Sequence, residues 1–135
     1  MAKTTRTPYN ASRFVTKVIT SNTTLGQRNT GTVIFLDNSE AIDLTLDFLD
    51  NGSYFKIVKR NANSAAFTIS SPSFSGVLLH DVGAGIVTTQ VSGEQINLPQ
   101  SACAGSYIDL VCDGQKWYVM GLSEGGAWTV AEIKQ

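Results

Sequence analysis

The side chains that could do chemistry in this chain are few and scattered. The single histidine, His80, precedes Asp81, but neighbouring residues on a strand point to opposite faces, so we expect no catalytic pair there. Cys103 and Cys112 cannot complete a zinc site alone. Paired buried carboxylates, as glycosidases require, are not indicated, because polar strand faces or turns hold Asp43, Asp47, Asp50, Asp109 and Asp113. The sequence therefore predicts no catalytic, cofactor-binding or metal-binding residue, and no enzyme.

The two cysteines are too few for a disulfide framework. Cys112 falls at the end of an expected strand and Cys103 in an expected loop. We expect buried free thiols at both positions, and a bridge between them stays open.

A nucleic-acid platform is the next possibility, since Lys56, Lys59 and Arg60 lie close to Tyr54 and Phe55. A net charge of −1 argues against it, and a solvated strand face with core aromatics explains the same residues. No run approaches the roughly 20 apolar residues of a membrane span, and no secretory leader is present. We therefore expect neither nucleic acid nor membrane as a partner.

Strands dominate the expected structure. Apolar and polar residues alternate with a period of two, and turn residues separate the runs. The spacing, with 42% hydrophobic residues, predicts an all-β, single-domain antiparallel β-sandwich or jelly-roll-like barrel over residues 15–135. The expected strands are 13–20, 32–36, 42–46, 54–59, 66–70, 76–80, 85–90, 95–98, 107–112, 116–121 and 127–133.

The clearest local signal is a hairpin in the last third of the chain. Two apolar runs, 107–112 and 116–121, flank Asp113-Gly114. Such a dipeptide favours a type I′ turn, which needs positive φ at both central residues.

A short pseudo-repeat is also present. Gly52-Ser-Tyr and Gly105-Ser-Tyr each introduce an alternating strand, and each follows another short strand. If the similarity is more than chance, it predicts two related halves of the domain.

Residues 1–14 form an expected extended N-terminal arm. Up to residue 17 the chain carries four basic side chains and no acidic one. The arm is interpreted either as a solvated terminus or as a segment that docks on an acidic neighbour.

The residues from Ile96-Asn-Leu-Pro99 to the Trp-Tyr-Val-Met-Gly run ending at Gly121 resemble virion β-modules of tailed bacteriophages. These are the capsid decoration (cement) proteins and similar fibre domains. The resemblance covers residues 42–121, with Gly52–Asn61 and Phe67–Ile69 matching the preceding hairpin.

The resemblance implies a structural virion protein that binds the outer capsid surface and stabilises capsomer junctions. The implied partners are the major capsid protein and two further copies in a homotrimer, with no cofactor. The implied location is the virion capsid surface, after synthesis in the host cytoplasm. The alternative is a fibre, spike or tail component that binds a host glycan.

Under the decoration interpretation, the arm and one aromatic residue supply the contacts. Basic residues would provide charge complementarity and large aromatics would provide anchors. We expect Trp117 in the core, and interface positions at Arg6, Tyr9, Arg13, Phe14, Lys17 and Trp128.

Overall fold

The computed structural model describes residues 15–61, 64–82 and 86–131, so the predicted arm lies outside the described chain. The described chain is all-β, as predicted, with a single 3₁₀ turn, η2 (Gln27–Asn29). The strands are β1 (Val15–Ile19), β2 (Thr23–Leu25), β3 (Thr32–Leu36), β4 (Ile42–Leu46), β5 (Tyr54–Lys59), β6 (Phe67–Asp81), β7 (Ile86–Leu98), β8 (Tyr107–Cys112), β9 (Trp117–Ser123) and β10 (Thr129–Ala131).

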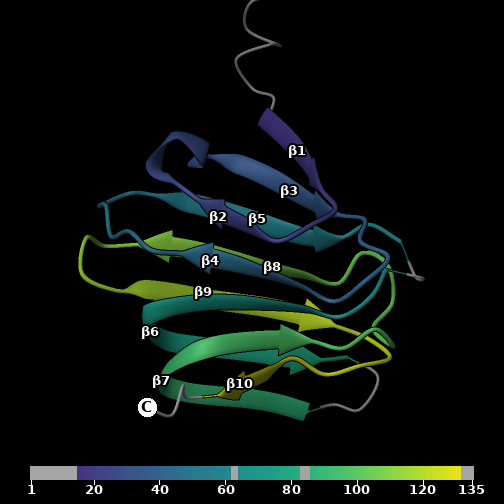
Figure 1. Ribbon diagram of the computed structural model, residues 1–135. Helices are drawn as coiled ribbons and strands as arrows, with labels where there is room; N and C mark the ends of the chain where they lie inside the picture. Colours follow the sequence, from purple (N-terminus) through teal and green to yellow (C-terminus); the bar gives the residue numbers. More distant parts are fainter. Residues whose placement is uncertain (1–14, 62–63, 83–85, 132–135) are drawn as a thin grey trace, which may run out of the picture.

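Hydrogen bonds join the strands in the order β1-β3-β5-β8-β9-β6-β4-β2, and β7 pairs with β6 and β10 (Figure 1). Strands β1, β3, β5, β8 and β9 form what we call half A, and β2, β4 and β10 belong to half B. The predicted antiparallel arrangement is wrong. Five of the nine strand pairs are parallel, including β1-β3, β3-β5, β2-β4 and β4-β6.

The parallel pairs arise because the chain runs in circuits. Each circuit places one strand in half A and the next in half B, as β1-β2, β3-β4 and then β5-β6 do. Successive circuits stack in the same direction. Several of the turn residues that separate the strands therefore carry the chain from one half to the other.

Asn38 fixes one of these corners. Its side chain is 2% exposed, and its Nδ2 donates to the carbonyl oxygens of Glu40, Ala65 and Ala66 at 2.8–3.2 Å. One side-chain amide group thus bonds to three backbone carbonyls from two successive corners. These carbonyls would otherwise lack partners, because the chain changes direction there and leaves the hydrogen-bonding pattern of the sheet.

The two longest strands belong to both halves. Residues 67–70 of β6 pair with β4, whereas residues 74–81 pair with β9, and the register shifts between them. Strand β7 follows the same course beside it, and both ribbons curve strongly in Figure 1. The sequence predicted four separate short strands here, 66–70, 76–80, 85–90 and 95–98, with Ser92-Gly93 interpreted as a turn. Pro72 lies at the register shift, where a missing N–H is tolerated.

The core lies between the halves and extends from Ile19 to Trp128. Inward residues alternate with outward ones, so β5 buries Phe55 and Ile57. Trp117 is fully buried as predicted. It packs edge-on against Phe48 with ring centroids 5.5 Å apart, and its Nε1 donates to the Phe48 carbonyl oxygen at 3.2 Å.

The hairpin joining β8 to β9 exists, but its turn differs from the prediction. The loop is four residues long, and φ is positive at Gly114 (+95°) but at no non-glycine residue of the described chain. Type I′ geometry at Asp113 is therefore wrong. The Asp113 carboxylate instead accepts the backbone N–H groups of Gln115 and Lys116, both at 2.8 Å. That local bonding stabilises a wider turn.

The pseudo-repeat has a structural counterpart. Strands β5 and β8 pair antiparallel, so the two Gly-Ser-Tyr copies lie at opposite ends of one ladder. The Gly52 and Gly105 N–H groups donate to the carbonyl oxygens of Cys112 and Lys59 at 2.8 and 2.7 Å, and both glycines have positive φ. The two copies are therefore related by a local twofold axis between β5 and β8. It does not extend to their neighbours, because β3 is parallel to β5 whereas β9 is antiparallel to β8.

Candidate interaction face

The outer surface of half A is apolar and aromatic. Because inward residues of each strand fill the core, the alternate residues point outward. The outward set, which we call the aromatic face, comprises the mostly apolar and aromatic residues Val18, Val33, Phe35, Tyr54, Val58, Tyr107, Val111, Tyr118, Met120 and Leu122, with Thr16, Lys56 and Asp109 among them. Met120 is 61% exposed, and Val111 and Tyr118 are 45% and 41% exposed. Exposed apolar and aromatic side chains gathered on one face are typical of an interaction site.

The outer surface of half B has the opposite character. Its outward side chains carry hydroxyl, amide or carboxylate groups, and we call them the hydroxyl face: Thr24, Asp43, Thr45, Thr68, Ser70, Gln95, Asn97 and Thr129. Thr68 Oγ1 donates to Asn97 Oδ1 at 2.5 Å across neighbouring strands. Such a surface stays hydrated at little cost, so the molecule is two-sided.

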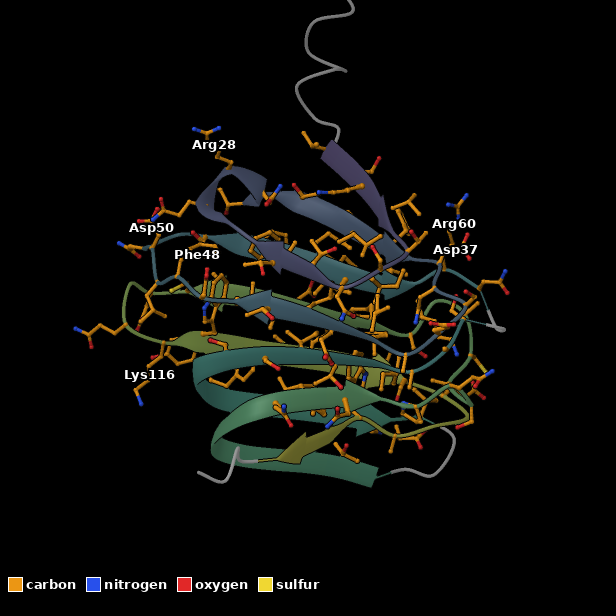
Figure 2. All side chains as sticks on the ribbon, in the orientation of Figure 1. Arg28, Asp37, Phe48, Asp50, Arg60 and Lys116 are labelled. Carbon is orange, nitrogen blue, oxygen red and sulfur yellow. The ribbon has the colours of Figure 1, made fainter. Side chains whose placement is uncertain are left out.

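Several of the charged side chains belong to the turns at the strand ends and point outward from the molecule. Figure 2 shows Asp37 and Arg60 at one end of the molecule, and Asp50 and Lys116 at the other. This placement leaves most of the aromatic face free of charge.

The two charges that the aromatic face does carry are held by its tyrosines. Tyr54 Oη donates to Asp109 Oδ1 at 2.8 Å, and Lys56 Nζ lies 4.3 Å from the centroid of the Tyr107 ring. Lys56 and Asp109 are also direct neighbours across β5 and β8. Opposite charges paired in this way with aromatic partners lower the cost of burying the face against another protein.

Burial and the neighbouring Asp109 carboxylate raise the pKa of Tyr54 to about 12. The unfolded chain loses this proton near its ordinary pKa of 10, while the folded chain keeps it. The contribution of protonated Tyr54 to the free energy of unfolding is therefore complete below pH 10 and is lost as the pH rises towards 12.

We expect the free energy of unfolding to fall between pH 10 and 12. The part due to Tyr54 is about 1 kcal/mol once solvent screening is allowed for. Urea unfolding across this range, compared with Tyr54→Phe, isolates it, because the other titrating groups are common to both proteins. Parallel pH profiles for the two proteins would show that this assignment is wrong.

A hollow of about 260 Å³ opens in the aromatic face over β8, β9 and the end of β6. At Gly121, which also lines the hollow, a larger side chain would not fit, because an added Cβ would lie 2.8 Å from Leu79 Cδ2. The polar groups at the hollow belong to His80, Tyr107 and Asp109. It suits one apolar side chain of a partner with a hydrogen-bonding group at its tip. The hollow is lined by Leu79, His80, Tyr107, Asp109, Met120, Gly121 and Leu122.

The residues predicted as contacts fall mostly elsewhere. Lys17 is exposed on the edge strand β1. Trp128, expected at a contact, is instead 2% exposed and packs edge-on against Phe67 with ring centroids 5.5 Å apart. It lies in the subunit's own core because β10 pairs with β7 and thereby closes half B. The described residues do not include the predicted contacts Arg6, Tyr9, Arg13 and Phe14.

The sequence did not predict the aromatic face, because apolar and polar residues do not alternate strictly along these strands. Outward positions of β8 read Tyr107, Asp109 and Val111, and those of β9 read Tyr118, Met120 and Leu122. Apolar residues at both inward and outward positions are the signal that could have indicated an interface.

The thiols and the metal-binding potential complete the survey. Cys112 is buried and free as predicted, whereas Cys103 is free but exposed, so the expectation of burial is wrong there. Among residues 15–61, 64–82 and 86–131, no cluster of three or more histidine, cysteine or acidic side chains could hold a metal ion. The same residues contain no helix long and apolar enough to cross a membrane.

A scan against protein-family models, a search of curated proteins and a search of solved structures each returned no match.

Proposed function

We propose that this chain is a structural virion protein of a tailed bacteriophage, a decoration protein that binds the outer capsid surface. The observation that carries the proposal is the two-sided surface, with an aromatic face on half A and a hydroxyl face on half B. A protein that coats a particle needs one face for the particle and another for water. The resemblance of residues 42–121 to virion β-modules supports the same role.

In this role the aromatic face contacts the major capsid protein. Tyr118 and Met120 supply exposed contact area, and the hollow beside Tyr107 receives a side chain of the partner. Aromatic anchors seated in hollows dominate the energy of most interfaces. Many copies on one lattice add weak contacts through multivalency. The fold that presents the face is, in our proposal, a β-sandwich of two halves.

The arm and the trimer extend the proposal. Residues 1–14 carry the basic side chains Lys3, Arg6 and Arg13, which suit an acidic capsid surface. Three copies around a threefold axis would bring three arms and three aromatic faces to one junction between capsomers.

A second role, a module of a fibre or spike that binds a host surface, is favoured by one observation. Among the residues that the structure describes, β1 pairs with β3 alone and β2 with β4 alone, so each is an edge of the described sheet. Their neighbours are parallel, so a further circuit of another module could stack there in the same direction.

Cryo-electron microscopy of virions from the phage that encodes the chain tests the proposal. We expect density for the β-domain at regular capsid positions, with the aromatic face turned towards the capsid. Density in the tail or a fibre would favour the second role. Particles that lack the protein altogether would refute both.

A further inference from the structure

One edge of half A is open at the end of the sheet opposite β1. Residues 86–90 of β7, which we call the β7 edge, pair with residues 77–81 of β6 in one unbroken register. The same β6 residues pair on their other side with β9, so β7 is the outermost strand there (Figure 1). In the part of the chain that the structure describes, β10 is the other partner of β7, and it pairs only with residues 95–97. The outer side of the β7 edge therefore offers backbone N–H and C=O groups to a further strand.

The other open edges of the described sheet are unsuited to pairing with a second copy. Lys17 lies on β1 directly across from Ile34, which is fully buried, so its side chain is on the side of the strand that faces the core. Two β1 strands side by side would bring two such lysines together. Strands β2 and β10 have three described residues each, which gives few hydrogen bonds. Short length and inward-pointing charge are common protections of sheet edges.

The β7 edge has neither protection. Its residues, Ile86-Val-Thr-Thr-Gln90, include no charged side chain and no proline, and four of the five are β-branched, as is typical of strands. The register shift in the β6-β7 pair lies between Ser70 and Phe74, so no bulge interrupts this stretch. An extended, uncharged edge of this kind is a template for another strand.

We propose that the β7 edge pairs antiparallel with the β7 edge of a second copy, so that the chain forms a dimer about a twofold axis. Because the edge carries no charge, two copies meet without like charges opposite each other, and threonine pairs across the strands add stability. The absence of charge also gives a different protein no complementary group to recognise. A second copy supplies a strand of the same length that is likewise open, and a twofold contact closes without leaving another β7 edge exposed.

The dimer places two aromatic faces on one side. The twofold axis between antiparallel strands is perpendicular to the sheet, so the half A sheets of the two copies would become continuous and present the same surface in the same direction. This consequence, unlike the dimer itself, rests on the proposed function: two faces engaging one capsid at once would bind more tightly than one. The contact would connect copies that belong to neighbouring trimers.

Sedimentation of the full chain without capsids tests the dimer at protein concentrations of about 1–100 µM. We expect a dimer, and we expect Thr89→Lys to raise its dissociation constant at least about tenfold, because two lysines would lie opposite each other near the axis. Thr16→Lys is the matched control, since Thr16 is exposed on the open edge strand β1. It should leave the dissociation constant unchanged. Urea unfolding verifies that both variants remain folded.

Cysteine cross-linking locates the contact. In a chain without its native thiols (Cys103→Ser, Cys112→Ala), a single cysteine is introduced at each of residues 88–90 in turn. At the axis a residue faces its own copy with a Cα–Cα distance of about 4.5–5.5 Å, which a disulfide can span. We expect a cross-linked dimer from at least one of these positions under mild oxidation, and none from Thr16→Cys.

Each of three results would overturn the proposal. The wild-type chain could remain monomeric over the whole concentration range. Thr89→Lys could assemble as well as the wild type, as in a trimer formed through another surface. Cross-links could form at Thr16 in preference to residues 88–90, which would place the second copy on β1. Because no capsid is present in these measurements, a negative result leaves the capsid role untouched, and a failure to bind capsids leaves the dimer untouched.

Discussion

Under the proposed function, replacing three exposed residues of the aromatic face should reduce binding to capsids at least 100-fold while leaving the domain folded. The variant combines Val111→Thr, Tyr118→Thr and Met120→Thr, at positions 45%, 41% and 61% exposed. Threonine is well tolerated in strands, so we expect a small change in the free energy of unfolding. Each interface hot spot typically contributes about 2 kcal/mol or more, so losing two accounts for the reduction.

The matched control changes three exposed positions of the hydroxyl face. Thr24→Ser, Asp43→Asn and Thr129→Ser alter side chains that also point away from the core. Co-sedimentation with particles stripped of the protein measures binding for both variants, and urea unfolding verifies the folds. If the control loses binding while the aromatic-face variant keeps it, the capsid contact belongs to half B and the assignment of faces is reversed.

Lys59→Met should destabilise the domain by about 2–4 kcal/mol. Methionine matches the length of the lysine stem and needs no desolvation, so replacing a buried charge this way is often neutral. Here the ammonium is the donor to two backbone carbonyls, and the Ala102 oxygen is buried. Losing the donor leaves that acceptor unpaired, which outweighs the gain. Burial lowers the pKa of Lys59, which means that the wild-type protein already bears a free-energy cost for taking the Lys59 ammonium out of water.

Lys56→Met is the matched control for this substitution. Lys56 lies three residues earlier on the same strand but points outward, with its ammonium over the Tyr107 ring. Losing that contact should cost about 0.5–1 kcal/mol. Urea denaturation of both variants gives the comparison. A Lys59→Met protein as stable as the wild type would show that the two carbonyls find other partners and that the loop does not depend on Lys59.

Local alternation predicted the short strands well and the connections poorly. The bounds of β3, β4, β5 and β8 match the expected ranges, because each is a run of apolar and polar residues closed by turn residues. Asp37-Asn38 was interpreted as a turn between two strands, and in the structure it is a corner that carries the chain from one half to the other. Turn composition reports that the chain bends, and the direction of the next strand depends on contacts such as those of Asn38, which come from residues 27 and 28 positions away.

The candidate site was less predictable than the fold. The aromatic face requires five strands to lie side by side, and only the β8-β9 pairing is a local hairpin. The pairing of β5 with β8 joins residues about 50 positions apart in the sequence. Trp128 was expected at a contact from its residue type and its place near the end of the sequence. Its burial depends on β10 pairing with β7, which no local pattern indicates.

The place of β9 in the sheet has a consequence for biosynthesis. Residues 117–123 are made late, yet they lie in the middle of the strand order, between β8 and β6. When only the first hundred residues have been made, β1, β3 and β5 form one group of strands, and β2, β4, β6 and β7 form another. No strand yet joins the two groups by hydrogen bonds, and the part of the core that Trp117 later fills is exposed. Chains that stop before β9 should therefore remain open and accessible to proteases.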